Sequence, residues 1–300
     1  MLSRRRFIHG LGLFCFGTAN MRMAMATEKS GGIKQIHADM MHKNCSAEFY
    51  VNGIPIRKYD PREQLFTSVP AHRYLVDGVN HLELVVNPGP TPSKARDGQQ
   101  EMDATGIECR ARIVRGEEGA FTGDPSEVLA QVEYRGEAGK KDVFPKVLST
   151  RVELGPLFGR WLWQDAETLT LDAKTVDAVM QYVRIIHGAY GRGDGALIAN
   201  KAKIVFDEGQ RANKYKDMAF SRQRFIDSLK THSQLKGWKM VPLEQLIPDL
   251  RVVANGKMIE AVARDWKPLV RTQPVPEYNN DVWDYRMFLS RIGGEWVMVR

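Results

Sequence analysis

The hydrophobic pattern of the chain changes its period near residue 155. Before this point apolar and polar residues alternate in short runs, as from Ile107 to Ile113, which is typical of strands with one buried face. After it, apolar residues recur at helical spacing between Val176 and Tyr190. A segment of alternating strands and a segment of amphipathic helices each have an apolar face to bury. The sequence therefore predicts two domains that meet at the Gly- and Pro-containing segment 155–159.

The first half, residues 44–155, is predicted to be a β-sandwich of some six to eight short strands. Asn52-Gly53 lies between apolar runs, and this pair is a strong signal for a two-residue hairpin turn. Asp77-Gly78 is a second turn signal, and it precedes the strand-like run from Val79 to Val86. Short strands separated by turns over about 110 residues are typical of a sandwich.

Two runs in this half, Phe49–Pro55 and Val76–Leu84, resemble neighbouring strands of jelly-roll modules in bacterial carbohydrate-active proteins. The resemblance covers about 40 residues and reflects sandwich geometry as well as ancestry. It implies a jelly-roll fold and does not imply that the domain binds sugar.

The second half, residues 160–300, is predicted to be α+β, with helices first and antiparallel strands after them. Three helices are expected at about 176–190, 197–213 and 221–235, the last capped by Ser221. The expected strands cover residues 238–241, 250–254, 257–263, 282–292 and 295–299. Asn255-Gly256 and Gly293-Gly294 are the expected turns.

This order of elements, with the ending Tyr285–Arg300, resembles the NTF2-like (SnoaL-like) superfamily. Members of this superfamily end in a strand, a Gly-containing turn and a Trp before a short final strand. The resemblance implies a curved antiparallel sheet, closed by the helices into a cone around a pocket. Many members are isomerases, dehydratases or hydrolases, and others only bind ligands or partners, so function has to be argued from the site.

His187, Tyr190 and Asp194 are the candidate catalytic residues of such a pocket. His187 lies on the apolar face of its predicted helix, Tyr190 follows one turn later, and Asp194 comes from the Gly-rich segment after it. Burial can tune an imidazole for acid–base work near neutral pH. The alternative is a structural His in the core, and no carboxylate matches a general base of the family.

The N-terminal residues 1–26 resemble a twin-arginine (Tat) export signal, which a receptor reads as an address. The pattern consists of Arg4, Arg5 and Phe7, followed by a short apolar stretch and the triplet Ala24-Met25-Ala26. Cleavage is expected after Ala26, followed by a flexible mature segment over 27–43. The apolar stretch is too short to cross a bilayer. An ordinary secretory signal or a membrane anchor is the alternative.

The net charge of +7 depends on this segment. Four arginines and no acidic residue leave with it, which lowers the formal charge to +3, and the remaining basic residues are interspersed with acids. A nucleic-acid partner is therefore not expected. No apolar run after residue 26 approaches the length of a membrane span, so a stable transmembrane segment is not expected either. Cys45 and Cys109 are candidates for a disulfide in an oxidising compartment, or they remain buried thiols.

No metal-ligand spacing, nucleophile elbow or phosphate-binding loop occurs in the sequence, so no cofactor is expected. The sequence therefore predicts an exported periplasmic two-domain protein that recognises a ligand or a partner in the cell envelope, with the Tat translocase as its partner during export. The alternative is an acid–base enzyme for a small molecule or an envelope sugar. A third reading, a subunit of a larger assembly, expects an exposed apolar patch that includes Trp161 and Trp163.

Overall fold

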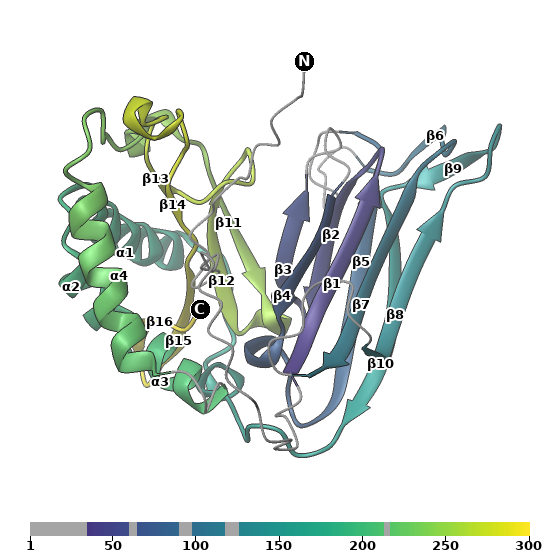
Figure 1. The fold of residues 1–300 in the computed structure, drawn as a ribbon, viewed down its shortest axis with the longest axis horizontal. Coiled ribbons are helices and arrows are strands. Elements are labelled where there is room, and N and C mark those ends of the chain that lie inside the picture. Colours follow the sequence, from purple (N-terminus) through teal and green to yellow (C-terminus); the bar gives the residue numbers. More distant parts are fainter. Residues whose placement is uncertain (1–34, 60–64, 90–97, 118–125, 213–216) are drawn as a thin grey trace, which may run out of the picture. The chain divides into compact units, whose positions relative to one another are not determined.

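The computed structural model describes residues 35–59, 65–89, 98–117, 126–212 and 217–300. The chain divides into two compact units, with the boundary between Arg160 and Trp161. The fold is rich in β-sheet, with antiparallel sheets in both units and four helices in the second (Figure 1). Each unit is described separately below.

The N-terminal unit contains two four-stranded antiparallel sheets, with strand orders β4-β1-β7-β8 and β10-β5-β2-β3, and a two-stranded ribbon, β6-β9. Its strands are β1 (Gln35–Lys43), β2 (Ser46–Val51), β3 (Ile54–Tyr59), β4 (Leu65–Pro70), β5 (Gly78–Asn87), β6 (Gln100–Asp103), β7 (Glu108–Gly116), β8 (Glu127–Arg135), β9 (Lys141–Phe144) and β10 (Lys146–Leu154).

One hydrophobic core lies between the two sheets of this unit. The predicted alternation on β7 is confirmed, because Ile107, Cys109, Ala111 and Ile113 are all buried in this core. Burial of one face of each sheet is the main stabilising contribution of such an arrangement.

The expectation of a flexible segment over residues 27–43 is wrong for its described part, since residues 35–43 form β1. This strand pairs with β4 on one side and with β7 on the other. Ile36, Ala38 and Met40 point into the core. These residues alternate as a half-buried strand requires, so strand pairing begins nine residues earlier than the predicted sandwich.

The Asn52-Gly53 hairpin is confirmed. Both residues have positive φ, 53° and 72°, as the mirror-image turn between β2 and β3 requires. The Asn52 side chain also donates to Asn80 Oδ1 at 2.8 Å, and Asn80 donates to Val76 O at 2.8 Å and Gly78 O at 3.0 Å. These amides join the β2–β3 turn to the start of β5.

The C-terminal unit contains four helices, a four-stranded antiparallel sheet with strand order β11-β12-β15-β16, and the short pair β13-β14. Its elements are α1 (Ala173–Gly191), α2 (Gly195–Lys201), α3 (Lys203–Ala212), α4 (Met218–His232), β11 (Pro248–Val253), β12 (Met258–Ala263), β13 (Val270–Arg271), β14 (Asp284–Tyr285), β15 (Phe288–Ile292) and β16 (Glu295–Met298). Figure 1 shows α1 and α4 on the same side of this sheet.

The helices differ from the prediction in number and in one boundary. The helix expected over 197–213 is interrupted at Ala202, which ends α2 with a backbone conformation outside the helical range. The last helix starts earlier than expected, because Asp217 and not Ser221 is its N-cap. The Asp217 carboxylate accepts a hydrogen bond from Phe220 N at 3.0 Å, as a helix start requires.

The strand expected over 282–292 is divided into β14 and β15, and the segment expected at 238–241 makes only a single bridge, from Met240 to Thr272. The hairpin between β15 and β16 is confirmed, with positive φ at both Gly293 and Gly294. Within the expected strand 282–292, Trp283, Tyr285, Met287 and Leu289 alternate to one face, which the period of a strand predicts to be core. All four are buried in the core between the helices and the sheet.

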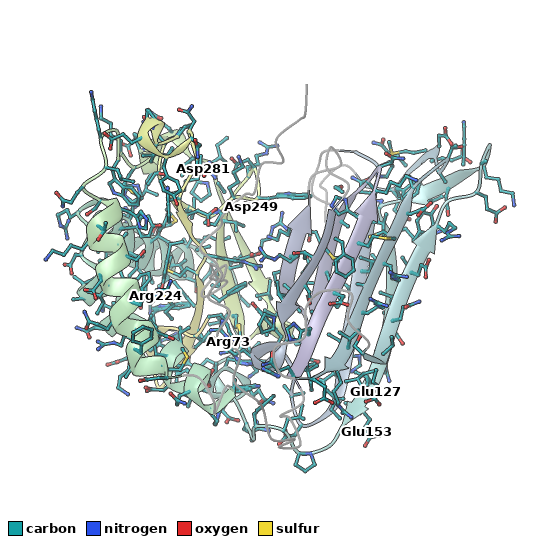
Figure 2. The ribbon with its side chains drawn as sticks, viewed as in Figure 1. Arg73, Glu127, Glu153, Arg224, Asp249 and Asp281 are labelled. Carbon is teal, nitrogen blue, oxygen red and sulfur yellow. The ribbon has the colours of Figure 1, made fainter. Side chains whose placement is uncertain are left out.

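Charged side chains of this unit pair with one another even where they are buried. On β12, Glu260 is buried and accepts from Arg286 Nη2 at 2.9 Å. Asp249 of β11, labelled in Figure 2, accepts from Arg251 at 3.1 Å. Buried charges are tolerated only when they are paired in this way.

Glu208 and Arg300 form the most deeply buried of these pairs. Arg300 Nη1 lies 2.5 Å from Glu208 Oε2, and the other carboxylate oxygen accepts from Leu162 N at 2.7 Å. The guanidinium groups of Arg211 and Arg300 lie 4.4 and 5.3 Å from the centre of the Trp161 ring. The pair therefore ties α3 to the residues before α1 and to the chain after β16.

Candidate functional site

Helix α1 carries two of the three predicted catalytic residues, His187 and Tyr190. Asp172 is the N-cap of this helix, and its carboxylate accepts from Thr175 N at 2.7 Å. Its buried residues recur at helical spacing and include Val179, Val183 and Ile186, so one face of the helix lies in the core.

The polar groups of His187 and Asp194 are both engaged in holding the fold. The His187 ring nitrogen Nε2 lies 2.9 Å from Val241 O, so it donates to that carbonyl. Asp194 is the N-cap of α2, and its carboxylate accepts from Leu197 N at 3.0 Å. No hydrogen bond joins His187, Tyr190 and Asp194 to one another within the described chain.

Tyr190 is fully buried, and its hydroxyl has no hydrogen-bond partner among the described residues. Burial raises its pKa well above the usual range, and the nearby charges of Asp284 and Tyr285 add to this shift. The hydroxyl is therefore a neutral donor at every physiological pH. An unpaired buried hydroxyl costs about 1–3 kcal/mol, so it requires an explanation.

The ring of Tyr190 belongs to an aromatic cluster of eight side chains from distant parts of the unit. The cluster consists of Tyr190, Phe206, Phe225, His232, Trp238, Tyr278, Trp283 and Tyr285. Tyr190 lies 5.6 Å from Trp238 and 6.0 Å from Tyr285, measured between ring centres. Trp283 lies 4.1 Å from His232. These are the ordinary separations of packed aromatic rings.

Two more donors of this cluster lack a partner among the described residues, the indole nitrogens of Trp238 and Trp283. The cluster also contains His232, whose Nδ1 lies 3.1 Å from Ser228 Oγ. Burial lowers the pKa of His232, which keeps its ring neutral at pH 7. The cluster thus combines apolar ring surface with three unpaired donors on contacting side chains, and it carries no positive charge at neutral pH.

Sequence reasoning singled out Tyr190 but did not group it with most of the side chains that surround it. Trp283 and Tyr285 were assigned to the core face of a strand, which is where they lie. His232 and Trp238 had no such signal, since they lie at and just beyond the end of α4. Only the tertiary fold brings these residues to Tyr190.

The other predicted residues are either buried or lie outside the described part of the chain. Cys45 and Cys109 are both buried, and both are free thiols. Trp161 and Trp163 are buried, so the exposed apolar patch expected to include them is not present at these positions. Arg4, Arg5 and Phe7 lie outside the described residues.

Within the described residues, no cluster of three or more His, Cys, Asp or Glu side chains has an arrangement suited to a metal ion. The described helices include none with the length and apolar character needed to cross a membrane. No protein-family model, curated protein or solved structure matches the chain. The aromatic cluster, with its three unpaired donors, is the candidate functional site.

Proposed function

We propose that this protein is exported to the periplasm and binds a small molecule at the aromatic cluster of its C-terminal domain. The observation that carries this proposal is the fully buried Tyr190 hydroxyl, which has no acceptor, in ring contact with Trp238. Binding sites for small molecules typically combine aromatic walls with a few polar groups that fix orientation. A ligand oxygen at this position would satisfy the hydroxyl.

The residues also define the chemical class of the ligand. All three unpaired groups are donors, since an indole N–H can only donate and the Tyr190 hydroxyl keeps its proton. The ligand therefore offers oxygen acceptors, such as carbonyl or sulfonate groups, and an apolar or aromatic body that packs against the rings.

At the level of fold, we propose that the C-terminal unit is an NTF2-like domain and the N-terminal unit a jelly-roll module. The first proposal is supported by helices followed by an antiparallel sheet, with Trp296 after the Gly293-Gly294 turn. The second is supported by the two antiparallel sheets around one core and by the contact between Asn52 and Asn80, the residues on which the resemblance rests.

Binding is a better proposal than acid–base catalysis. His187 and Asp194 each have a structural hydrogen bond, so catalysis would rest on Tyr190 alone. A hydroxyl with a strongly raised pKa is a poor base at neutral pH. The same group is well suited to donate a hydrogen bond without giving up its proton.

Replacing Tyr190 by Phe is expected to stabilise the ligand-free protein by about 1 kcal/mol, because it removes an unpaired buried hydroxyl. The matched control is Tyr182→Phe on the same helix, since the Tyr182 hydroxyl is also buried but donates to Lys201 O at 3.3 Å. This control is expected to lose about 1 kcal/mol. Urea unfolding followed by tryptophan fluorescence measures both changes. If both variants lose stability equally, Tyr190 already has a partner and the proposed site is not there.

Binding itself is tested with 8-anilinonaphthalene-1-sulfonate, an aromatic sulfonate of the proposed class. Energy transfer from tryptophan to the bound dye is expected in the unmodified protein, and Tyr190→Phe is expected to weaken the dye's affinity about 10-fold, as loss of one buried hydrogen bond requires. Tyr182→Phe should bind as well as the unmodified protein. Equal affinity in all three proteins would contradict the proposal.

Export is tested by replacing both Arg4 and Arg5 with Lys, which is expected to keep the protein in the cytoplasm because the receptor reads the arginine pair. Arg22→Lys is the control, since Arg22 lies in the same segment outside the pair. In cells with an intact Tat pathway the mature protein should start at Thr27, as mass spectrometry can show. Unchanged periplasmic delivery in cells without the Tat receptor would overturn this part of the proposal.

A further inference from the structure

Two buried thiols and a histidine meet at one end of the N-terminal unit. Cys45 lies in the bend between β1 and β2, and Cys109 lies on β7. Both side chains have zero solvent exposure. The Cys45 thiol donates to the backbone oxygen of Glu108 at 3.8 Å, although 63 residues separate the two, so Cys45 lies beside the residue that precedes Cys109 on β7.

His42 completes this thiol cluster of His42, Cys45 and Cys109. It is paired directly with Cys109 across the β1–β7 ladder. Its ring nitrogen Nδ1 lies 3.0 Å from Cys45 O, which holds the ring against the bend that carries Cys45.

The two thiols differ in acidity. The hydrogen bond from the Cys109 thiol lowers the pKa of Cys45 to about 6, against the opposing effect of burial, and His42 contributes in the same direction. The same hydrogen bond, together with burial, raises the pKa of Cys109 well above its usual range. These opposite shifts make Cys45 the more acidic and therefore the attacking cysteine, and Cys109 the resolving one.

We propose that Cys45 and Cys109 are an oxidisable pair that closes to a disulfide by exchange with a low-molecular-weight disulfide. The placement of the buried Cys45 thiol against the Glu108 carbonyl carries the proposal, because it brings Cys45 beside Cys109 on β7. It does not depend on the ligand or on the export route proposed above.

The exchange has two steps. The Cys45 thiolate attacks one sulfur of oxidised glutathione, the S–S bond of glutathione breaks, and one glutathione thiolate leaves. Cys109 then loses its proton to the solvent and attacks Cys45 Sγ, which releases the second glutathione. Two protein thiols are oxidised and one glutathione disulfide is reduced to two thiols, so no other oxidant is required.

Burial of the pair controls the rate of exchange. Because both sulfur atoms are inaccessible, glutathione reaches Cys45 only when the bend at Asn44–Cys45 opens locally. Once closed, the disulfide ties this bend to β7, and in the chain-entropy model a loop of this length makes unfolding of the unit at least about 100-fold rarer.

The test uses the full chain with Cys15 replaced by Ser in every sample, so that Cys45 and Cys109 are the only cysteines. After incubation with oxidised glutathione, mass spectrometry is expected to find a product lighter by two hydrogens and a peptide that links Cys45 to Cys109. Cys109→Ser should instead accumulate a mixed disulfide between Cys45 and glutathione. Cys45→Ser should react at least about 10-fold more slowly, because its remaining thiol is protonated.

The pH dependence of Cys45 alkylation shows whether Cys45 is activated or only lies close to Cys109. The rate of Cys45 alkylation by iodoacetamide should rise with a midpoint near pH 6 in the reduced protein. Cys109→Ala should move this midpoint upward because it removes the donor, and Cys109→Ser should largely restore it. Equal midpoints in all three proteins, or equal reactivity of the two single-cysteine variants, would overturn the proposal.

A separate control addresses slow access of glutathione to the buried Cys45. If the native protein does not react, the incubation is repeated in the lowest urea concentration at which hydrogen exchange detects opening of β1. Failure to form the Cys45–Cys109 disulfide under that condition would also overturn the proposal.

Discussion

Replacing Arg300 by Met is expected to destabilise the C-terminal unit by about 3–5 kcal/mol, because it leaves the buried Glu208 carboxylate without its main partner. Arg211 compensates only in part, since its Nη2 lies 3.6 Å from Glu208 Oε1 and makes no hydrogen bond there. Contact of the guanidinium with the Trp161 ring is lost as well.

Urea unfolding followed by tryptophan fluorescence measures this change selectively. All six tryptophans of the chain lie between Trp161 and Trp296, within the C-terminal unit. Lys203→Met is a matched control on α3, the helix that carries Glu208. Lys203 pairs with Asp207 at the surface, so its replacement should change stability little.

The double variant Glu208→Gln with Arg300→Met distinguishes a charge effect from a packing effect. Glutamine still accepts from Leu162 N but carries no charge. If the loss of stability in Arg300→Met arises from the unpaired negative charge of Glu208, the double variant should be more stable than Arg300→Met alone. A double variant that loses the sum of both single effects would contradict this explanation.

Replacing Asn80 by Ala is expected to destabilise the N-terminal unit by about 3 kcal/mol or more. The Asn80 amide is fully buried and donates to two backbone carbonyls, and its oxygen accepts from Val76 N and Asn52 Nδ2, both at 2.8 Å. Removing it leaves several buried groups unpaired at once. Tryptophan fluorescence does not report on this unit, so hydrogen exchange of the β2 and β5 amides, resolved by mass spectrometry, is the measurement.

Two further variants test the cause of this loss. Asn80→Asp keeps an acceptor but removes both donors and buries a charge, so its stability should improve as pH falls and the carboxyl group becomes protonated. Gln131→Ala is the control, because Gln131 is exposed on β8 and makes one side-chain bond to Glu133. A loss as small in Asn80→Ala as in this control would show that the amide network contributes little.

The parts of the fold that sequence predicted correctly depend on local chemistry. The turns at Asn52-Gly53, Asn255-Gly256 and Gly293-Gly294 need positive φ at both central residues, and few residue types adopt it readily. Helix α1 was found because a long amphipathic period is hard to produce by chance.

The parts that sequence missed depend on longer-range contacts. On β1 the core-facing positions include His42, so the alternation is not purely apolar, and the strand is fixed only by its partners β4 and β7. The gap between α2 and α3 at Ala202 has no Gly or Pro to mark it. The aromatic cluster joins Tyr190 to residues up to Tyr285, and a pattern within one segment cannot predict such a set.

The place of β1 in its sheet has a consequence for synthesis on the ribosome. β1 (purple in Figure 1) is an interior strand, and its neighbour β7 ends only at Gly116. A nascent chain therefore carries β1 with an open edge while the next seventy or so residues are made. Open edges template wrong pairing between chains. Residues 35–43 are thus a stretch where a chaperone would protect the growing chain, although in the finished protein this strand has a neighbour on both sides.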